Sequence, residues 1–375
     1  MCTKQWIWTG RNYPYFTYNQ KYLDKIILEV KYNQGILNGI YTGINSKNIQ
    51  QASLNLLTLE ALDTSAIEGN ILNRDSVRSS IAKKLGIDSL NKDVSTIHTD
   101  GLIDILLDAS NNYNKEFTLQ RLFGWHNALF PTGYSSHTKI NVAQFRGEEE
   151  MQVVSGLHGQ ENVHYIAPPR KQLDTEMAIY LEWLNDNTDL SIIKAGIAHL
   201  WFVIIHPLDD GNGRVARAIS DMLLARELNQ TTKLFSISSA IKDDKINYYK
   251  ILESSTNQNS LDITLWLEWL LNTLLQALKN SRKSIQYILD KTSFWDFHKD
   301  TILNERQLKL LNKLLDMGID NFKGNINTRK YASITKTSKT TASRELKDLL
   351  NKNCIIQCEG TSGRNISYEV LLIKK

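Results

Sequence analysis

Apolar positions recur every three or four residues along most of the chain, which is the period of an amphipathic α-helix. This period predicts helices over residues 48–69, 119–130 and 304–318. Gly69 suits the end of the first helix because glycine accepts left-handed backbone angles. The run SIIKAGIAHLWFVII at 191–205 is apolar on nearly every side and predicts a central buried helix. The pattern therefore predicts a mainly α protein.

One stretch inside this helical pattern changes to alternation. The segments MQVVSG at 151–156 and NVHYIAPP at 162–169 flank a polar turn, LHGQE, at 157–161. Alternation on both sides of a short polar turn predicts a β-hairpin, and two consecutive prolines close it. We expect a hairpin flap that includes Val153 and Val154.

The pattern changes again from about residue 285. Helices are predicted over 328–335 and 338–352, and two strands follow within 354–372 around EGTSGRN. Two short helices followed by a hairpin are the elements of a winged helix. We therefore expect a helical N-terminal region at 1–112, a core at 113–280, and a winged helix-turn-helix at 285–375.

Composition adds little to this picture. The 375 residues are 42% hydrophobic and 22% charged, and the formal charge of +4 is too small to imply a nucleic-acid or membrane partner for the whole chain. Cys354 and Cys358 have strand spacing, about 13 Å between their Cα atoms, which is too far for a disulfide. No signal-peptide pattern begins the sequence, and no apolar run approaches the ~18 residues of a membrane span. We expect a soluble, cytoplasmic protein with no membrane partner.

The charge is unevenly distributed. Residues 323–375 hold eleven Lys or Arg and four Asp or Glu, a net of +7, which leaves −3 for the rest. The second helix of the predicted winged helix and its surroundings hold Lys336, Lys339, Arg344 and Lys347. This charge suits phosphate contacts, so DNA is one expected partner. Glu345 and Asp348 are expected to interrupt the basic face, and a protein-binding role for the module is the alternative.

The segment HPLDDGNGR at 206–214 lies between two apolar segments and carries the candidate chemistry. Proline disfavours the helical conformation for the residue before it, so the buried helix should end at His206. The free N–H groups at the start of the next helix favour an anion, most naturally a phosphate. Arg214 and Arg217 lie one turn apart and can reach the same anion, and Asp210 can hold a hard cation that bridges phosphates. This set of groups predicts transfer at phosphorus.

The residues HPLDDGNGRVAR closely resemble the signature of the Fic (Fic/Doc) family, His-Pro-Phe-x-Asp/Glu-Gly-Asn-Gly-Arg-x-x-Arg. Leu208 replaces the usual phenylalanine, and we expect that side chain to pack in the core. The resemblance covers roughly residues 50–275 and implies a Fic-fold helical core with a β-hairpin flap. The aromatic start WIWTGRNYPYF also looks like the N-terminal extension of many bacterial Fic proteins.

The resemblance further implies that AMP moves from ATP to a Ser, Thr or Tyr hydroxyl of a target protein, with release of pyrophosphate. His206 would be the general base, and Asp210 would hold Mg²⁺ on the α- and β-phosphates. The hairpin at Val153 and Val154 would align the target segment by strand addition. The implied nucleotide-binding residues are Gly211, Asn212, Gly213, Arg214, Val215, Ala216, Arg217, Tyr249 and its less favoured neighbour Tyr248.

A second motif resembles the family's inhibitory sequence, Ser/Thr-x-x-x-Glu-Gly/Asn. It comprises Thr64, Glu68 and Gly69 within TSAIEGN and lies N-terminal to the signature. A carboxylate at Glu68 could pair with Arg217 and take the place of the γ-phosphate. The sequence therefore predicts an autoinhibited adenylyltransferase. Self-modification is also expected, and a homodimer that controls the inhibitory helix is consistent with the sequence.

The residues alone are also consistent with two other hypotheses about the function. The first is a nucleic-acid-binding regulator that uses the winged helix, with the Fic core as a nucleotide sensor. The second is a Fic-fold enzyme that transfers phosphate or phosphocholine, or that removes AMP. His199 lies inside the buried helix and is expected to be a hydrogen-bonded core residue.

Overall fold

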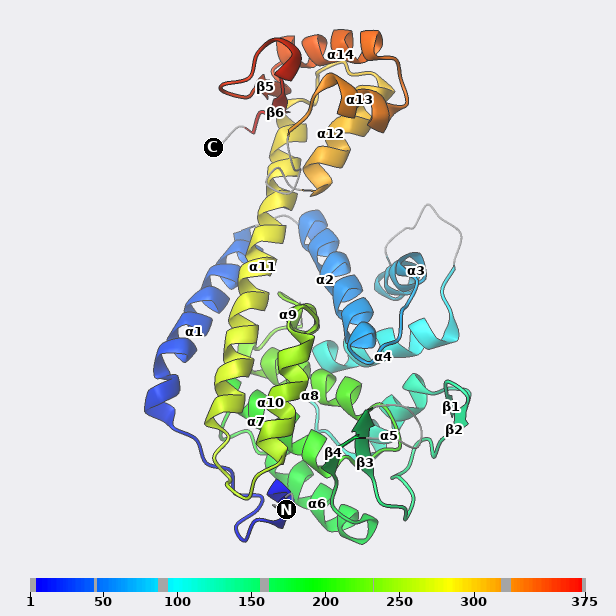
Figure 1. Ribbon diagram of the computed structural model, residues 1–375, viewed down its shortest axis with the longest axis vertical. Coiled ribbons are helices and arrows are strands. Elements are labelled where there is room, and N and C mark those ends of the chain that lie inside the picture. Colours follow the sequence, from blue (N-terminus) through cyan, green and yellow to red (C-terminus); the bar gives the residue numbers. More distant parts are fainter. Residues whose placement is uncertain are drawn as a thin grey trace. The chain divides into compact units, whose positions relative to one another are not determined.

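The structure is a computed structural model that describes residues 5–43, 46–86, 94–155, 162–231, 233–317 and 325–372 (Figure 1). It is mainly helical, as predicted, with three small two-stranded sheets. The elements up to the second sheet are η1 Ile7–Thr9, α1 Gln20–Gly43, α2 Ser46–Ile67, α3 Arg74–Leu85, α4 Ile97–Asn111, α5 Leu119–Leu129, β1 Tyr134–Ser135, β2 Thr138–Lys139, β3 Gln152–Ser155 and β4 Asn162–Ile166.

The rest of the chain continues with helices before the last sheet. These elements are η2 Arg170–Gln172, α6 Leu173–Asn185, α7 Ile192–Ile205, α8 Asn212–Leu228, α9 Ile237–Asp243, α10 Lys245–Thr256, α11 Thr264–Phe297, α12 Glu305–Met317, α13 Thr328–Thr335, α14 Lys339–Asn351, β5 Ile355–Gln357, η4 Gly363–Asn365 and β6 Tyr368–Val370. None of the described helices combines the length and the apolar character that a membrane span requires.

The chain forms two compact units. The larger unit comprises Met1–Ile44 and Ile49–Ser281, and the smaller comprises Asn45–Asn48 and Arg282–Lys375. The division after Ser281 lies close to the change of pattern expected near residue 285. Apart from Asn45–Asn48, the regions 1–112 and 113–280 lie together in the larger unit.

Helix α7 forms the centre of the larger unit, as its apolar sequence predicts. Nearly all of its residues are buried, and it packs against α6 and α8. A Cβ atom at Gly196 would lie 2.7 Å from Leu267 Cδ2, so glycine permits the close approach of α11. His199 is buried on the same helix and bonds Ser220 and Tyr248, which is the core role expected for it.

The aromatic N-terminal segment packs on the helical core and on the hairpin. Trp6 meets Tyr165 of β4 edge to face at 5.6 Å between ring centroids. Trp8 Nε1 donates to the carbonyl of Ile166 at 2.7 Å, and Trp201 Nε1 donates to the Tyr13 hydroxyl at 3.1 Å. These aromatic residues thus serve packing within the larger unit.

The predicted hairpin is present as the antiparallel pair β3 and β4, with a register shift between Val153 and Val154. Its predicted turn at 157–161 lies outside the described residues. Strand β3 is largely exposed, and the Val154 side chain is 46% exposed. A peptide strand could therefore approach the described part of β3.

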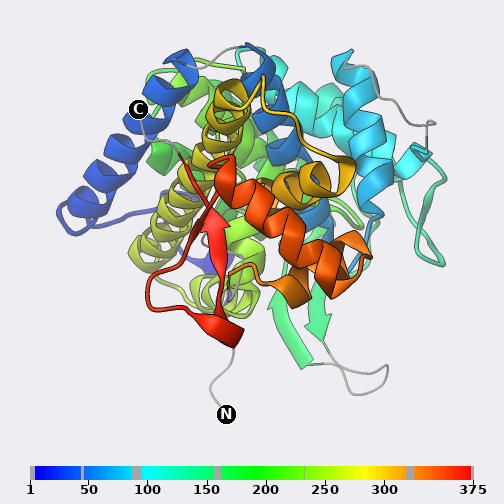
Figure 2. The same cartoon turned by 90° about the horizontal axis from the view of Figure 1, so that it is seen from above.

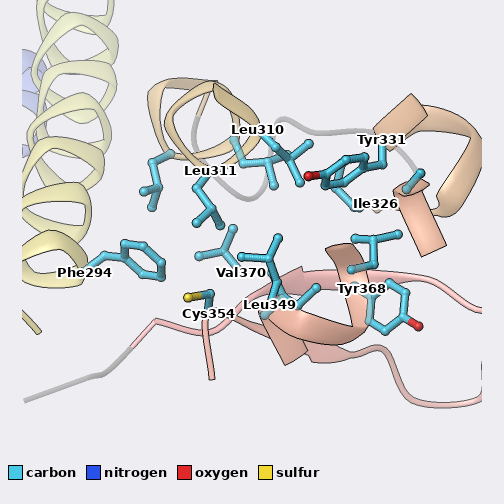
Figure 3. Close-up of a cluster of buried hydrophobic side chains, with 14 residues drawn as sticks. Phe294, Leu310, Leu311, Ile326, Tyr331, Leu349, Cys354, Tyr368 and Val370 are labelled. Carbon is cyan, nitrogen blue, oxygen red and sulfur yellow. The ribbon is translucent and has the colours of Figure 1, made fainter. Parts of the chain in front are cut away.

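The smaller unit contains the predicted elements in the predicted order: α12, α13, α14 and the antiparallel pair β5 and β6. Its core is a cluster of side chains from these elements, including Leu310, Leu349, Cys354 and Val370 (Figure 3). Cys354 and Cys358 are both free thiols, in agreement with their strand spacing. The assignment of this unit as a winged helix stays a prediction.

Candidate active site at the start of helix α8

The loop between α7 and α8 is held in an unusual backbone conformation. Helix α7 ends at Ile205, and His206 adopts a left-handed conformation with φ 50° and ψ 56°, which avoids the helical region that Pro207 disfavours. Gly211 precedes α8 with φ 88°, and a Cβ there would lie 3.0 Å from the Phe130 ring. The loop therefore requires glycine at position 211 for both reasons.

Asn212 closes the loop upon itself. Its side-chain oxygen accepts from the Leu208 N–H at 3.0 Å, and its amide nitrogen donates to the Leu208 carbonyl at 2.8 Å. Leu208 is fully buried, as expected from its place in the signature. The Asn212 side chain is thus used within the loop, and only its backbone N–H belongs to the open first turn of α8.

His206 has the protonation and the tautomer of a general base. Its Nδ1 lies 3.1 Å from the Val203 carbonyl, so Nδ1 carries the proton and Nε2 keeps a free lone pair. Burial lowers the pKa of His206 to about 4, and the nearby Arg146 acts in the same direction. The imidazole is therefore neutral at pH 7 and able to accept a proton.

Arg217 connects α8 to the end of α2. Its Nη2 donates to Glu68 Oε1 at 2.7 Å, its Nε donates to the Thr64 hydroxyl at 2.8 Å, and its Nη2 also reaches the Thr64 carbonyl at 3.0 Å. Arg217 is 1% exposed. Burial alone would lower the pKa of Arg217, but the Glu68 carboxylate outweighs burial and raises it. The structure thus brings together the two motifs that lie about 150 residues apart in the sequence.

The end of α2 fixes the position of Glu68. Gly69 has φ 84°, its N–H donates to Ala66 O at 3.1 Å, and the Asn70 N–H donates to Ser65 O at 3.0 Å. These two bonds are those of a Schellman motif, and Glu68 is its capping residue. The predicted role of Gly69 as a helix stop is therefore seen in the structure.

Gly213 provides the space for the pair. A Cβ atom at this position would clash with Glu68 Oε1 and would lie 3.2 Å from Arg217 Nη1. The carboxylate consequently lies directly against the first turn of α8. Because the free N–H groups of that turn favour an anion, Glu68 occupies a place suited to a phosphate.

Arg214 is the second cation of this turn. It lies over the Phe130 ring at 4.8 Å and approaches Asp210 Oδ1 at 3.5 Å. Its Nε is buried and has no hydrogen-bond partner among the described residues. Val215 and Ala216, also expected at the nucleotide, have side chains fully buried in the core, so only their backbone could contribute.

Asp210 is the one predicted metal ligand. Its carboxylate accepts from the Ser135 hydroxyl and from the Gly211 N–H, and its side chain is 40% exposed. No group of three or more His, Cys, Asp or Glu side chains in the described parts of the chain is arranged to hold a metal ion. A single accessible carboxylate fits Mg²⁺, which usually completes its shell with water and substrate phosphates.

The two candidate tyrosines differ in their surroundings. Tyr248 is 2% exposed, and its hydroxyl bonds His199 Nε2 at 3.0 Å, so it belongs to the core. Tyr249 is 41% exposed, and its hydroxyl donates to the Ile67 carbonyl at 3.0 Å. Of the two, only Tyr249 is placed to meet a ligand, and it also contacts Ile67, the last residue of α2.

Arg146 supports the loop between α7 and α8 and is a site residue that was not predicted from the sequence. It is 2% exposed, and its Nε donates to the His206 carbonyl at 2.9 Å. Its Nη2 donates to the Pro168 carbonyl, and its backbone N–H donates to the Pro207 carbonyl at 3.0 Å. The side chain therefore ties the loop that carries His206 to the end of the hairpin. No local pattern around Arg146 predicts this contact.

Two family models match the chain. A domain of unknown function, DUF4172, matches residues 6–87, and the Fic/DOC family matches residues 116–224. The protein adenylyltransferase Fic of Culex quinquefasciatus is 24% identical over 214 residues, which cover 53% of this chain and 40% of that protein. The protein adenylyltransferase fic-1 of Caenorhabditis elegans is 43% identical over 49 residues, which cover 12% of this chain and 10% of that protein.

Solved structures support the fold. A Fic family protein from Desulfovibrio desulfuricans G20 is similar with a TM-score of 0.50 and 17% identity, over 92% of this chain and 95% of that one. A Fic domain-containing signaling protein from Bacteroides thetaiotaomicron also has a TM-score of 0.50 with 17% identity, over 69% of this chain and 97% of that one. Residues 116–224 of this chain therefore form a domain of the Fic/DOC family.

Proposed function

We propose that this chain is an autoinhibited protein adenylyltransferase that moves AMP from ATP to a hydroxyl side chain of a target protein. The observation that carries the proposal is the Glu68–Arg217 ion pair at the open first turn of α8, next to the neutral base His206. The names of the curated relatives support the reaction class, although the chain spans less than half of the length of the first of them.

In the proposed reaction, His206 Nε2 takes the proton from the target hydroxyl. The oxygen of that hydroxyl attacks the α-phosphorus of ATP at the same time. The bond from that phosphorus to the bridging oxygen breaks, and pyrophosphate leaves with the electron pair. Arg214, whose buried Nε bonds none of the residues that the structure describes, would hold the β- and γ-phosphates. Arg217 would join it once released from Glu68. Mg²⁺ held by Asp210 would neutralise phosphate charge.

The same contacts explain the proposed inhibition. While Glu68 holds Arg217, one cation is unavailable to the triphosphate, and a carboxylate lies where a phosphate would be. Two anions cannot share this turn without strong repulsion in a low dielectric. ATP would then bind with its α-phosphate misaligned for attack.

The test is the intact mass of the Glu68→Gly protein after incubation with ATP and Mg²⁺, with and without candidate targets. We expect added AMP on the protein itself or on a target, and no addition to the Glu68→Gly, His206→Ala double variant. Added phosphate would assign a different transfer reaction. No addition under any condition would favour the alternative, a nucleotide-sensing regulator, and would overturn the proposal.

A further inference from the structure

The exposed face of α14, in the smaller unit, is basic and polar throughout. Three of its six exposed side chains are cationic, and these three form no ion pair with another described residue. The other three are neutral hydrogen-bonding groups. In chain order the six are Lys339, Thr340, Ser343, Arg344, Lys347 and Asn351.

Glu345 does not interrupt this face, which corrects the expectation from the sequence. Its side chain is 4% exposed and points inward, where Arg306 Nε, Asn304 Nδ2 and the Tyr331 hydroxyl donate to it at 3.1, 3.1 and 2.7 Å. The Arg306 hydrogen bonds lower the pKa of Glu345. The carboxylate is therefore neutralised inside the unit and adds no repulsion to the exposed face.

Asp348 of α14 is also hydrogen-bonded to other side chains of the smaller unit. It accepts from Lys352 Nζ at 2.6 Å and from Gln307 Nε2 at 2.8 Å. Because Lys352 pairs with this carboxylate, the net charge of the pair is zero. Both acids of α14 are thus compensated by partners outside the exposed face.

The opposite face of α14 anchors the helix. Ala342, Leu346 and Leu349 are buried in the cluster that Figure 3 shows around Leu349 and Val370. Helices α13 and α14, drawn in orange in Figures 1 and 2, are joined by a turn of three residues, 336–338. This is the length of turn found in helix-turn-helix motifs, whose second helix enters the DNA major groove.

We propose that α14 binds duplex DNA through this face. The major groove of B-DNA admits one α-helix, and the face offers cations for phosphates together with neutral donors and acceptors for base edges. Lys339 and Lys347, at either side of the helix centre, contact phosphates. Arg344 and Ser343 lie between them and face the base edges, where arginine pairs best with guanine. This inference concerns the smaller unit and does not depend on the proposed transfer reaction.

The test measures binding of the full chain to a labelled mixed-sequence duplex of about 30 base pairs, long enough for a helix-turn-helix footprint, by fluorescence anisotropy across a salt series. The variant replaces Lys339, Arg344 and Lys347 with glutamine. The matched control replaces three exposed lysines of the same unit with glutamine. They are Lys299, Lys309 and Lys313, so both variants lose three positive charges.

We expect the wild-type affinity to fall steeply with salt, because each neutralised phosphate adds about 0.9 to the slope of log K against log salt. In the α14 variant, the magnitude of this slope should be smaller by about 2 to 3. Its affinity for the duplex at low salt should fall at least tenfold. In the control variant, the slope and the affinity should both stay within about a factor of three of the wild-type values, since only non-specific charge is removed. The Glu68→Gly variant should bind DNA with the same affinity as the wild type. Failure of the DNA-binding proposal and failure of the proposed transfer reaction can therefore be told apart.

Three outcomes would overturn the inference. One is equal loss of binding in the α14 and control variants, which would reduce the effect to net charge. Another is no binding of the duplex by the wild type at low salt, which would assign the face to a protein partner. Duplex RNA serves as a further comparison, since its narrow major groove excludes a helix. Preference for RNA would also contradict the proposal.

Discussion

Glu68 and Arg217 form an ion pair of 2.7 Å that joins the end of α2 to the first turns of α8. The arginine is 1% exposed, and the pair lies beside Gly213, the residue that leaves space for an anion. Thr64 supports the same guanidinium through its hydroxyl and its carbonyl. Under the proposed autoinhibition, changing any one of these contacts should release the end of α2 from Arg217.

Replacing Glu68 should activate the protein in a graded way. Glu68→Gly removes the carboxylate and should raise AMP transfer about tenfold or more, since a charged hydrogen bond contributes about 1.5–3 kcal/mol. Glu68→Gln keeps the size and an acceptor but loses the charge, so its rate should lie between those of the wild type and of Glu68→Gly. Radiolabelled ATP gives all three rates. A rate of Glu68→Gly equal to that of the wild type would refute autoinhibition by this residue.

Thr64 should act through its hydroxyl. Thr64→Ala removes the acceptor for Arg217 Nε, and the loss of about 1 kcal/mol should raise the transfer rate severalfold. Thr64→Ser keeps the hydroxyl and should behave like the wild type. If the serine variant were as active as the alanine variant, packing of the threonine methyl would be responsible, and the hydrogen bond would not.

Much of the larger unit could be predicted from local pattern. The helix α7 follows from its apolar run, its end at Ile205 follows from Pro207, and the stop of α2 follows from Gly69. The buried Leu208 and the core role of His199 also agree with the sequence. Each of these features depends on short-range backbone rules or on burial, which a sequence expresses directly.

The contacts that complete the site could not be predicted in this way. Arg146 bonds carbonyls about 20 and 60 residues away in the chain, and no periodicity marks such a partner. The inward direction of Glu345 likewise depends on Arg306 and Tyr331 from other helices. Position on a helix gives the face of a side chain only when the packing partners of that helix are known.

Arg146 should be a positioning residue for the base. Arg146→Lys keeps a charge but cannot bond both the His206 and the Pro168 carbonyls, so the loop should shift and the melting temperature should fall. In the Glu68→Gly background we expect a larger loss in kcat than in KM for ATP, because a misplaced base affects the chemical step. Arg170→Lys is the matched control, since Arg170 pairs with the exposed Asp174. Equal losses in the two variants would contradict the assignment.

The buried histidines should make stability depend on pH. Burial lowers the pKa of His199 to about 3 and that of His206 to about 4, whereas an unfolded histidine titrates near 6.5. Below about pH 6.5 the unfolded chain therefore binds more protons than the folded one, and stability is lost as the pH falls. Each histidine should lower the free energy of unfolding by up to ~1.4 kcal/mol per pH unit across its window. Denaturant unfolding at pH 7 and pH 5 measures this slope.

The variant His199→Gln should make the dependence of stability on pH less steep, whatever its effect on absolute stability, because glutamine binds no proton in either state. An unchanged slope in this variant would show that His199 is already protonated in the folded protein.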